Sequence, residues 1–402
     1  MSAPPAGAAD RPALASAAGP PARVCIDVTR TLESGLHSGI QRVVRGLYRG
    51  ATACAAERDV SVHAVRWLDR QWIDVGVLPT HPLEGTGPAR AAQPPARLQP
   101  RPGDVLLLAD ASWYGNPWPA VDGFLRAGGT LAGYVHDLLP LQRPGWFRPG
   151  VGARFAAHLA ALRARASRLF TGSQHVAAQL AALPGPRLPL HRLPPASSLR
   201  DADADAGALR PRGPATAAAG APFYLSVATL EPRKLHGLLL DAFEAYWRAG
   251  GPATLLLVGA PGWCRETLLT RVREHPEQRR RLRWLRDVDD AALAALYHDA
   301  QALIYLSRDE GFGLPVLEAR QLGCPVIASD RPALREAGGD WPRYLPAADA
   351  GALRAALEQP PPRRRALPAA RDWADVAREL LAALGAGAVR PATGRGGARD
   401  GQ

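Results

Sequence analysis

Cysteine is scarce in this sequence of 402 residues, and long apolar runs are missing. The four cysteines are widely scattered with no Cys-x-x-Cys pair, which argues against a disulfide framework and against a zinc site. No apolar run approaches the about 18–20 residues of a membrane-spanning helix. The Ala/Pro-rich N-terminus also lacks the pattern of a secretory signal peptide. We therefore expect a cytoplasmic protein.

Lysine is nearly absent, although the chain is strongly basic. Lys234 is the only lysine among 49 Lys and Arg residues, and the formal net charge is +12. Such a charge indicates an anionic partner, namely phosphate, nucleic acid or an acidic membrane surface. The excess of arginine matches the coding bias of a GC-rich genome, which weakens this signal. A lysine kept against that bias, however, indicates a task that arginine cannot perform.

The composition is that of a globular protein, with 47% hydrophobic and 21% charged residues, and the length suits about two domains. In both halves, short apolar runs typical of buried parallel strands alternate with stretches of helical spacing. We therefore expect an α/β protein of two doubly wound parallel-sheet domains. The expected boundaries are a disordered tail over 1–22, a domain over 23–200, a linker over 201–221, a domain over 222–370, a helical segment over 371–385 and a disordered tail over 386–402.

Ligands of such folds bind beyond the carboxyl ends of the strands. The segment RDEGFGLPVLE (308–318) occupies such a position, because it directly follows the predicted strand ALIYLS (302–307). Gly311 and Gly313 let the backbone approach a ligand, and the start of the next helix favours phosphate. Glu310 and Glu318 suit the recognition of hydroxyl groups, because carboxylates accept hydrogen bonds. The alternative is that Glu318, in the first helical turn, only complements the helix dipole.

A second segment, EPRK (231–234), follows the predicted strand FYLSVAT (223–229). Arg233 offers a planar fork and Lys234 a compact charge, so the two can clamp an anion. The alternative is a solvated turn, which is the usual place of an exposed Arg-Lys pair. His136 also follows a predicted strand, but taken alone it is more often structural. Asp137 either orients the His136 ring or caps the turn.

These motifs together resemble glycosyltransferase family 4, whose members are retaining, metal-independent enzymes of the GT-B fold. Residues 221–385 resemble its donor domain: Glu310 and Glu318 match the E-x7-E motif, and Arg233 and Lys234 match the diphosphate-binding pair. SGIQRVVR (38–45) and VHDLLPLQRPGWF (135–147) resemble the branch that contains bacterial mannosyl- and rhamnosyltransferases of surface polysaccharides. Leu235 and His236 depart from the family, which commonly has Asn after the Arg-Lys pair.

The resemblance implies roles for both domains. The first domain would bind the acceptor and the second the nucleotide sugar, and the segment 371–385 would be a helix that crosses back to the first domain. Arg233 and Lys234 would neutralise the donor diphosphate, Glu318 would bind the ribose and Glu310 would lie beside the hexose. The other residues implied in the site are His136 at the sugar, Gly39 at the diphosphate, and Gly311, Phe312, Gly313 and Leu314 at the sugar and phosphate.

The expected activity is therefore the transfer of a hexose, with retention, to a glycan or lipid-linked oligosaccharide in the synthesis of O-antigen or capsule. GDP-mannose is the first expected donor, and no cofactor or metal is expected. Alternatives are a rhamnosyl or other hexosyl donor, or a catalytically silent GT-B scaffold subunit of an assembly complex. No nucleic-acid partner is expected, because no recognition motif accompanies the spread arginines. The basic surface favours loose association with the inner membrane.

Overall fold

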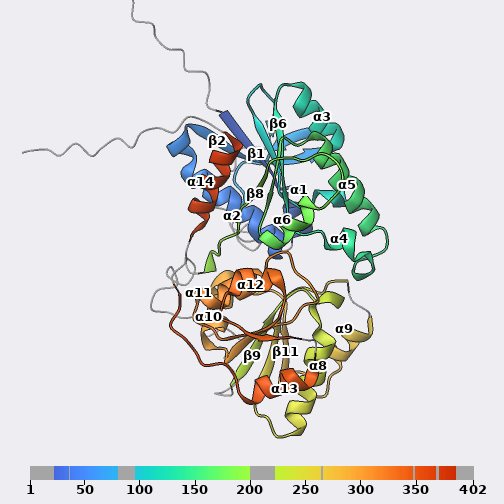
Figure 1. Cartoon of the computed structure of the whole chain (residues 1–402), viewed down its shortest axis with the longest axis vertical. Coiled ribbons are helices and arrows are strands. Elements are labelled where there is room, and N and C mark those ends of the chain that lie inside the picture. Colours follow the sequence, from blue (N-terminus) through green and yellow to red (C-terminus); the bar gives the residue numbers. More distant parts are fainter. Residues whose placement is uncertain are drawn as a thin grey trace, which may run out of the picture.

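The chain forms two α/β domains, one above the other in Figure 1. The computed structural model describes residues 22–35, 37–79, 96–199, 222–263, 266–346, 349–367 and 371–385. The predicted tails and linker lie outside the described residues, except for Ala22, with which the first strand begins.

The described strands of the N-terminal domain form one sheet in the order β4-β3-β2-β1-β5-β6-β7-β8. Adjacent strands are parallel except at the edge, where β3 pairs antiparallel with both β2 and β4. The prediction of a parallel sheet is therefore wrong at this edge, because only two residues separate β2 from β3 and such a turn can only reverse the chain. The strands are β1 (Ala22–Asp27), β2 (Val60–Leu68), β3 (Gln71–Asp74), β4 (Ala96–Arg97), β5 (Val105–Leu108), β6 (Thr130–Val135), β7 (Arg168–Thr171) and β8 (Leu190–Arg192).

Helices cover both faces of this sheet. Alternate side chains of a strand point to opposite faces, and here the apolar side chains on both faces are buried in cores. On β1, Val24 and Ile26 pack in one core and Cys25 packs in the other. The helices are α1 (Thr29–Ser34), α2 (Gly39–Cys54), α3 (Trp118–Arg126), α4 (Leu139–Gln142), α5 (Val151–Arg165) and α6 (Gln174–Ala181), with short 3-10 turns η1 (Ala55–Arg58), η3 (Ser112–Tyr114) and η4 (Pro144–Trp146).

The C-terminal domain contains a second sheet, parallel throughout its described strands, in the order β11-β10-β9-β12-β13-β14. Two apolar cores lie on its faces. Its strands are β9 (Phe223–Val227), β10 (Thr254–Val258), β11 (Leu282–Leu285), β12 (Ala302–Tyr305), β13 (Val326–Ser329) and β14 (Arg343–Leu345). Its helices are η5 (Pro232–Lys234), α8 (His236–Arg248), α9 (Glu266–Arg273), α10 (Asp290–Asp299), α11 (Leu314–Gln321), α12 (Pro332–Gly338) and α13 (Ala350–Glu358).

The last described helix, α14 (Trp373–Leu384), returns to the N-terminal domain and lies beside α2 (Figure 1). Asp372 and Asp375 form a capping box at its start. The contact is close because α2 has glycine there: a Cβ built on Gly46 would lie 2.1 Å from the Trp373 ring, and one on Gly50 would lie 2.0 Å from the Trp373 carbonyl oxygen. The chain thus connects the two domains a second time.

Candidate active site

Two loops of the C-terminal domain meet where adjacent parallel strands end. The loop after β9 contains η5 with Arg233 and Lys234, and the loop after β12 contains Glu310. The backbone N–H of Arg308 donates to the Arg233 carbonyl oxygen at 2.9 Å, which joins the loops directly. Because strands β9 and β12 are neighbours, residues far apart in the sequence lie at one edge of the sheet.

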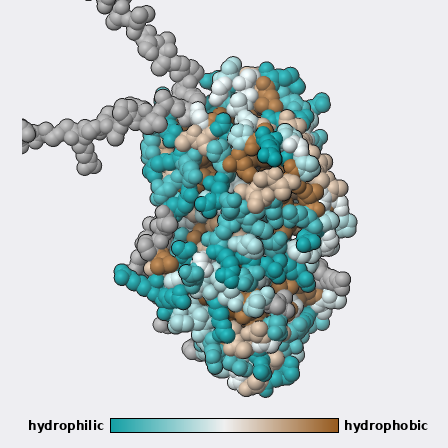
Figure 2. All heavy atoms as spheres, in the orientation of Figure 1, coloured by the Kyte–Doolittle hydropathy of each residue, from teal (hydrophilic) through white to brown (hydrophobic). Residues whose placement is uncertain are grey.

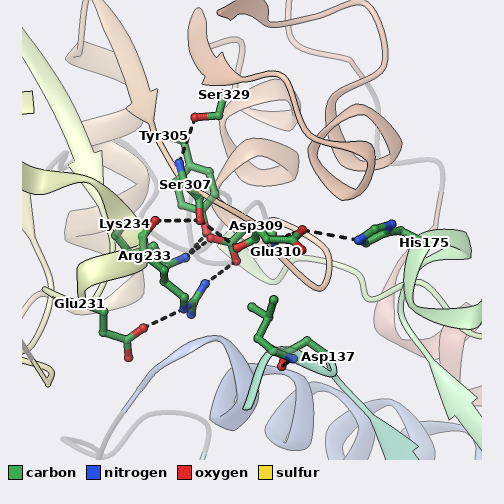
Figure 3. Close-up of polar contacts among 11 residues, drawn as sticks. Asp137, His175, Glu231, Arg233, Lys234, Tyr305, Ser307, Asp309, Glu310 and Ser329 are labelled. Carbon is green, nitrogen blue, oxygen red and sulfur yellow. Dashed lines mark hydrogen bonds and ion pairs between the residues drawn. The ribbon is translucent and has the colours of Figure 1, made fainter. Parts of the chain in front are cut away.

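Arg233, Lys234 and Glu310 form one cluster, in which Lys234 and Glu310 are buried and Arg233 is half-buried (Figure 3). The Lys234 Nζ lies 2.5 Å from Glu310 Oε1 and donates to the Tyr305 hydroxyl at 2.6 Å. Arg233 binds Glu310 Oε2 through Nη1 and Glu231 Oε2 through Nε, both at 2.9 Å. Lys234 is only 8% exposed, so the alternative of a solvated turn is wrong.

The charged groups in this cluster shift one another's pKa values. Burial alone would raise the pKa of Glu310, but Arg233 and Lys234 outweigh it and lower that pKa to about 2. Burial and the neighbouring Arg233 lower the pKa of Lys234, while Glu310 opposes this shift. Glu310 is therefore an anion near neutral pH, able to accept hydrogen bonds but unsuited to donate a proton. The two cations can each donate to an anionic ligand.

Glu318 lies on α11, away from this cluster. Its Oε1 lies 2.5 Å from Arg42 Nη1 of α2, and its Oε2 accepts a hydrogen bond from the Tyr297 hydroxyl at 3.0 Å. The expectation that Glu318 occupies the first helical turn is wrong, because α11 already begins at Leu314, after Gly313 with φ of 105°. Burial raises the pKa of Glu318 and Arg42 opposes it. Glu318 therefore forms an ion pair with the N-terminal domain, and its role is not limited to complementing the dipole of α11.

His136 and Asp137 bring the N-terminal domain against the Glu310 loop. A Cβ built on Gly311 would lie 2.1 Å from the His136 carbonyl oxygen, so only glycine fits there. His136 Nε2 hydrogen bonds to the Ala109 carbonyl oxygen at 2.7 Å, and burial lowers the pKa of His136 to about 4, which keeps the ring neutral. Asp137 Oδ1 accepts from the Leu139 N–H at 3.0 Å, so it caps the turn and does not orient the ring.

The remaining predicted residues also lie where the domains meet. The first residue of α2, Gly39, faces the start of α11: its ideal Cβ would lie 4.0 Å from Leu314. Leu314 packs in a core cluster of the N-terminal domain, and Phe312 packs against cores of both domains. Ser173 on the N-terminal side donates to the Gly311 carbonyl oxygen at 2.6 Å. The site therefore has two parts, the Arg233–Lys234–Glu310 cluster and the Glu318 region beside α2.

Some residues in this arrangement are not predicted from the sequence. Tyr305 belongs to a predicted apolar strand, and nothing in the pattern distinguishes its hydroxyl. Arg42 could have been found, because it lies three residues after Gly39 in the segment SGIQRVVR and so shares its helix face. Tyr297 lies on α10 together with Asp290, whose Oδ1 lies 3.8 Å from Arg42 Nη2. The helical spacing of this segment carried no sign of a site.

Part of the chain is similar in sequence to known glycosyltransferases. Residues 212–373 match the family model described as "Glycosyl transferases group 1". The chain is 35% identical over 254 residues to the serotype-specific mannosyltransferase WbdA of Escherichia coli, covering 60% of this chain and 31% of WbdA. It is 34% identical over 165 residues to the phosphatidyl-myo-inositol mannosyltransferase of Mycobacterium leprae, covering 40% of this chain and 39% of that protein. The chain thus spans about a third of the length of the curated relatives it matches.

Solved structures show the same architecture over most of the chain. Sucrose-phosphate synthase from Thermosynechococcus elongatus superposes with a TM-score of 0.57 at 18% identity, covering 90% of this chain and 94% of its own. Anabaena HepE in complex with UDP-glucose gives a TM-score of 0.56 at 14% identity, covering 84% and 88%. The fold is GT-B. The fold class predicted from the sequence is thereby confirmed. The cluster lies in the C-terminal domain beside Gly311, which contacts Ser173 and His136 of the N-terminal domain.

Proposed function

We propose that this chain is a retaining glycosyltransferase of the family 4 type, which moves a hexose from a nucleotide diphosphate sugar to a hydroxyl group of a growing glycan. The observation that carries the proposal is the cluster of Arg233, Lys234 and Glu310 at the strand ends that face the other domain. The group 1 match covers these residues, and the curated relatives include mannosyltransferases as well as glycogen synthases.

In the proposed reaction, Arg233 and Lys234 stabilise the diphosphate as the bond to the sugar breaks. Fixed positive groups in a buried site stabilise developing charge strongly, because little reorganisation is needed. Their charge also leads us to propose that no divalent metal is required. At the start of α11 we propose a contribution from the Leu314 N–H alone, since Pro315 has no N–H and the Val316 N–H donates to the Gly313 carbonyl oxygen.

Glu310 is proposed to bind hydroxyl groups of the transferred hexose, and Glu318 those of the ribose. The lowered pKa of Glu310 suits this role, since an ionised carboxylate only accepts hydrogen bonds. The neutral ring of His136 would contact the sugar from the N-terminal domain. We propose that the acceptor attacks from the face of the leaving phosphate, so that the phosphate takes the acceptor proton and the configuration is retained.

The proposed donor is GDP-mannose, with a rhamnosyl or other hexosyl donor as the alternative. Support comes from relatives such as the O-antigen chain mannosyltransferase B of Escherichia coli, 37% identical over 121 residues. The proposed product is a bacterial surface polysaccharide, made on the cytoplasmic side from a glycan or lipid-linked acceptor. A silent scaffold subunit would have no need to keep both cations and both carboxylates.

The test is a screen of the purified chain against a panel of nucleotide sugars, with donor hydrolysis as the readout and EDTA present. We expect turnover of GDP-mannose above that of the other donors. Hydrolysis of another donor would reassign the sugar. Binding of nucleotide sugars without hydrolysis or transfer to any glycan acceptor would support the scaffold instead, and activity that needs Mn²⁺ would contradict the metal-independent mechanism.

A further inference from the structure

We propose that one surface of the N-terminal domain docks on a bilayer rich in anionic phospholipid. This aromatic–arginine surface consists of Arg30, Tyr114, Arg143, Trp146, Arg148 and Arg154. It spans α1, η3, η4 and the first turns of α5. The proposal locates the membrane association that the basic composition suggests, and its binding step does not depend on the transferase reaction.

Charge is distributed unevenly along the N-terminal domain. The segment 138–200 contains nine arginines and no aspartate or glutamate. Within the described part of the chain, Arg165 of this segment pairs with Asp122, and Arg163 donates to backbone carbonyl oxygens. Arg143, Arg148 and Arg154 are different: they are exposed, and none of them forms an ion pair with a described carboxylate. Such charges complement lipid phosphates.

Aromatic rings lie among these arginines. The Tyr114 side chain is 44% exposed, with the guanidinium carbons of Arg30 and Arg154 at 5.0 and 5.9 Å from its ring centroid. The guanidinium of Arg143 lies 5.9 Å from the Trp146 ring. Tyrosine and tryptophan are enriched at membrane interfaces, because they have an apolar body and a polar edge. Arg30 pairs with Glu33 at 3.5 Å, so the uncompensated charge lies on Arg143, Arg148 and Arg154. A neutral glycan could stack on the rings and accept hydrogen bonds from these arginines, but only an anionic partner neutralises their charge.

The aromatic–arginine surface adjoins the candidate site. His136 and Asp137, which contact Gly311, are followed directly by α4 and η4. In Figure 1, α4 lies at the end of the N-terminal domain that borders the C-terminal domain. Figure 2 shows hydrophobic and hydrophilic residues side by side over the N-terminal domain, which forms the upper half of that view. Docking here would hold the site near the lipid surface, where an acceptor carried by a lipid could reach it.

No described helix has the length and the apolar character needed to cross a membrane. Binding would therefore depend on charge and on insertion of rings at the interface, two contributions that can be separated experimentally. Salt screens the first, whereas burial of an apolar ring is not reduced by salt.

The experiment is sedimentation of the full chain with phosphatidylglycerol vesicles, phosphatidylcholine vesicles serving as the neutral reference. The test variant carries Arg143→Glu, Arg148→Glu and Arg154→Glu. The matched control carries Arg248→Glu, Arg280→Glu and Arg354→Glu on exposed positions of the C-terminal domain, which changes the net charge equally. We expect the test variant to lose on the order of 100-fold in partitioning, since each basic residue at the surface contributes about fivefold, and the control to lose far less.

Trp146→Ser tests the ring contribution, and we expect it to lower the residual binding that persists at high salt. Equal losses in the test and control triples would show that net charge alone drives binding, and retention of binding by the test triple would overturn the proposal. If single-stranded DNA binds the surface more tightly than the vesicles do, the partner is nucleic acid and the proposal is wrong. Donor hydrolysis in solution should be unchanged in the test triple, which separates this proposal from the transferase activity.

Discussion

The ammonium of Lys234 lies 2.5 Å from a carboxylate oxygen of Glu310, and both side chains are more than nine-tenths buried. Removal of one partner from a buried ion pair leaves the other charge uncompensated, which is costly. Here the carboxylate faces two cations, so its loss would leave Arg233 and Lys234 with excess positive charge. Glu310 thus balances the charges that we assign to diphosphate binding.

Glu310→Gln should therefore lower turnover without weakening the binding of GDP. We expect a fall in turnover of roughly 100-fold, since a group beside the reacting sugar is lost, and GDP affinity that is unchanged or higher because the cations are no longer neutralised. Calorimetry and steady-state kinetics measure the two quantities. Glu318→Gln is the matched comparison, with the opposite expectation: weaker GDP binding. Exchanged results would mean that the two carboxylates have exchanged roles.

Arg42 and Glu318 form a buried ion pair between the two domains. Arg42→Met should open the molecule, because Glu318 would otherwise be buried without its cation. Small-angle scattering should show a larger radius of gyration, with the circular dichroism spectrum unchanged. In the double variant with Glu318→Gln the radius should return toward the wild-type value. An unchanged radius in Arg42→Met would show that this pair does not hold the domains together.

Gly46→Ala should destabilise the packing of α14 on α2, because the new methyl group would overlap the Trp373 ring. Overpacking of this kind costs about 1–3 kcal/mol, measurable as a loss in the free energy of unfolding. Gly123→Ala on α3 is the control: its new Cβ would lie 3.9 Å from the nearest atom, on Arg126, and alanine favours the helix by roughly 0.5–1 kcal/mol. Equal effects in the two variants would contradict the close contact of α14 with α2.

Three histidines should make stability fall as the pH drops from about 6.5 toward 4. Burial lowers the pKa of His136, His158 and His236 to about 4. Below their ordinary pKa of about 6.5 the unfolded chain binds protons that the folded chain does not, so stability present above pH 6.5 is lost on acidification. At pH 5.5 each histidine should have cost roughly 1 kcal/mol relative to pH 7. Denaturant titrations across this pH range measure the free energy of unfolding, which should fall less steeply with decreasing pH in His158→Gln than in the wild-type chain. An equal dependence on pH in the two proteins would mean that burial does not lower the pKa of His158.

The sequence carries enough to predict the two α/β domains, because the central strands are continuously apolar and are buried on both faces. Leu255–Val258 of β10 shows this, with alternate residues in opposite cores. Short elements were not predictable. The strand β3 (Gln71–Asp74) has four residues of mixed polarity, and its antiparallel pairing follows from a turn at Asp69 and Arg70, both with positive φ.

The candidate site is likewise predictable only in part. Motif spacing identifies the loops at the strand ends, because an apolar strand followed by glycines and a carboxylate can be recognised in the sequence alone. Arg42 could have been identified as a candidate from its place on the helix face of Gly39, and Tyr305 could not. The contacts Arg42–Glu318 and Lys234–Tyr305 themselves were not predictable, because they depend on how distant segments approach in space. The roles given to Glu310, Glu318 and His136 remain predictions.

The most direct test of diphosphate binding by Lys234 is a calorimetric titration of GDP, in EDTA, into the wild-type chain and Lys234→Arg. Lys234 lies between Glu310 and the Tyr305 hydroxyl, which leaves no room for a broader guanidinium. Misplacement by about 1 Å can cost on the order of 100-fold at a reacting centre, so turnover should fall comparably while the fold persists. We predict GDP binding by the wild-type chain without metal and binding at least 10-fold weaker in Lys234→Arg, a loss of about 1.4 kcal/mol. Equal affinities in the two proteins, or no binding of GDP, UDP or ADP by the wild-type chain, would contradict the account.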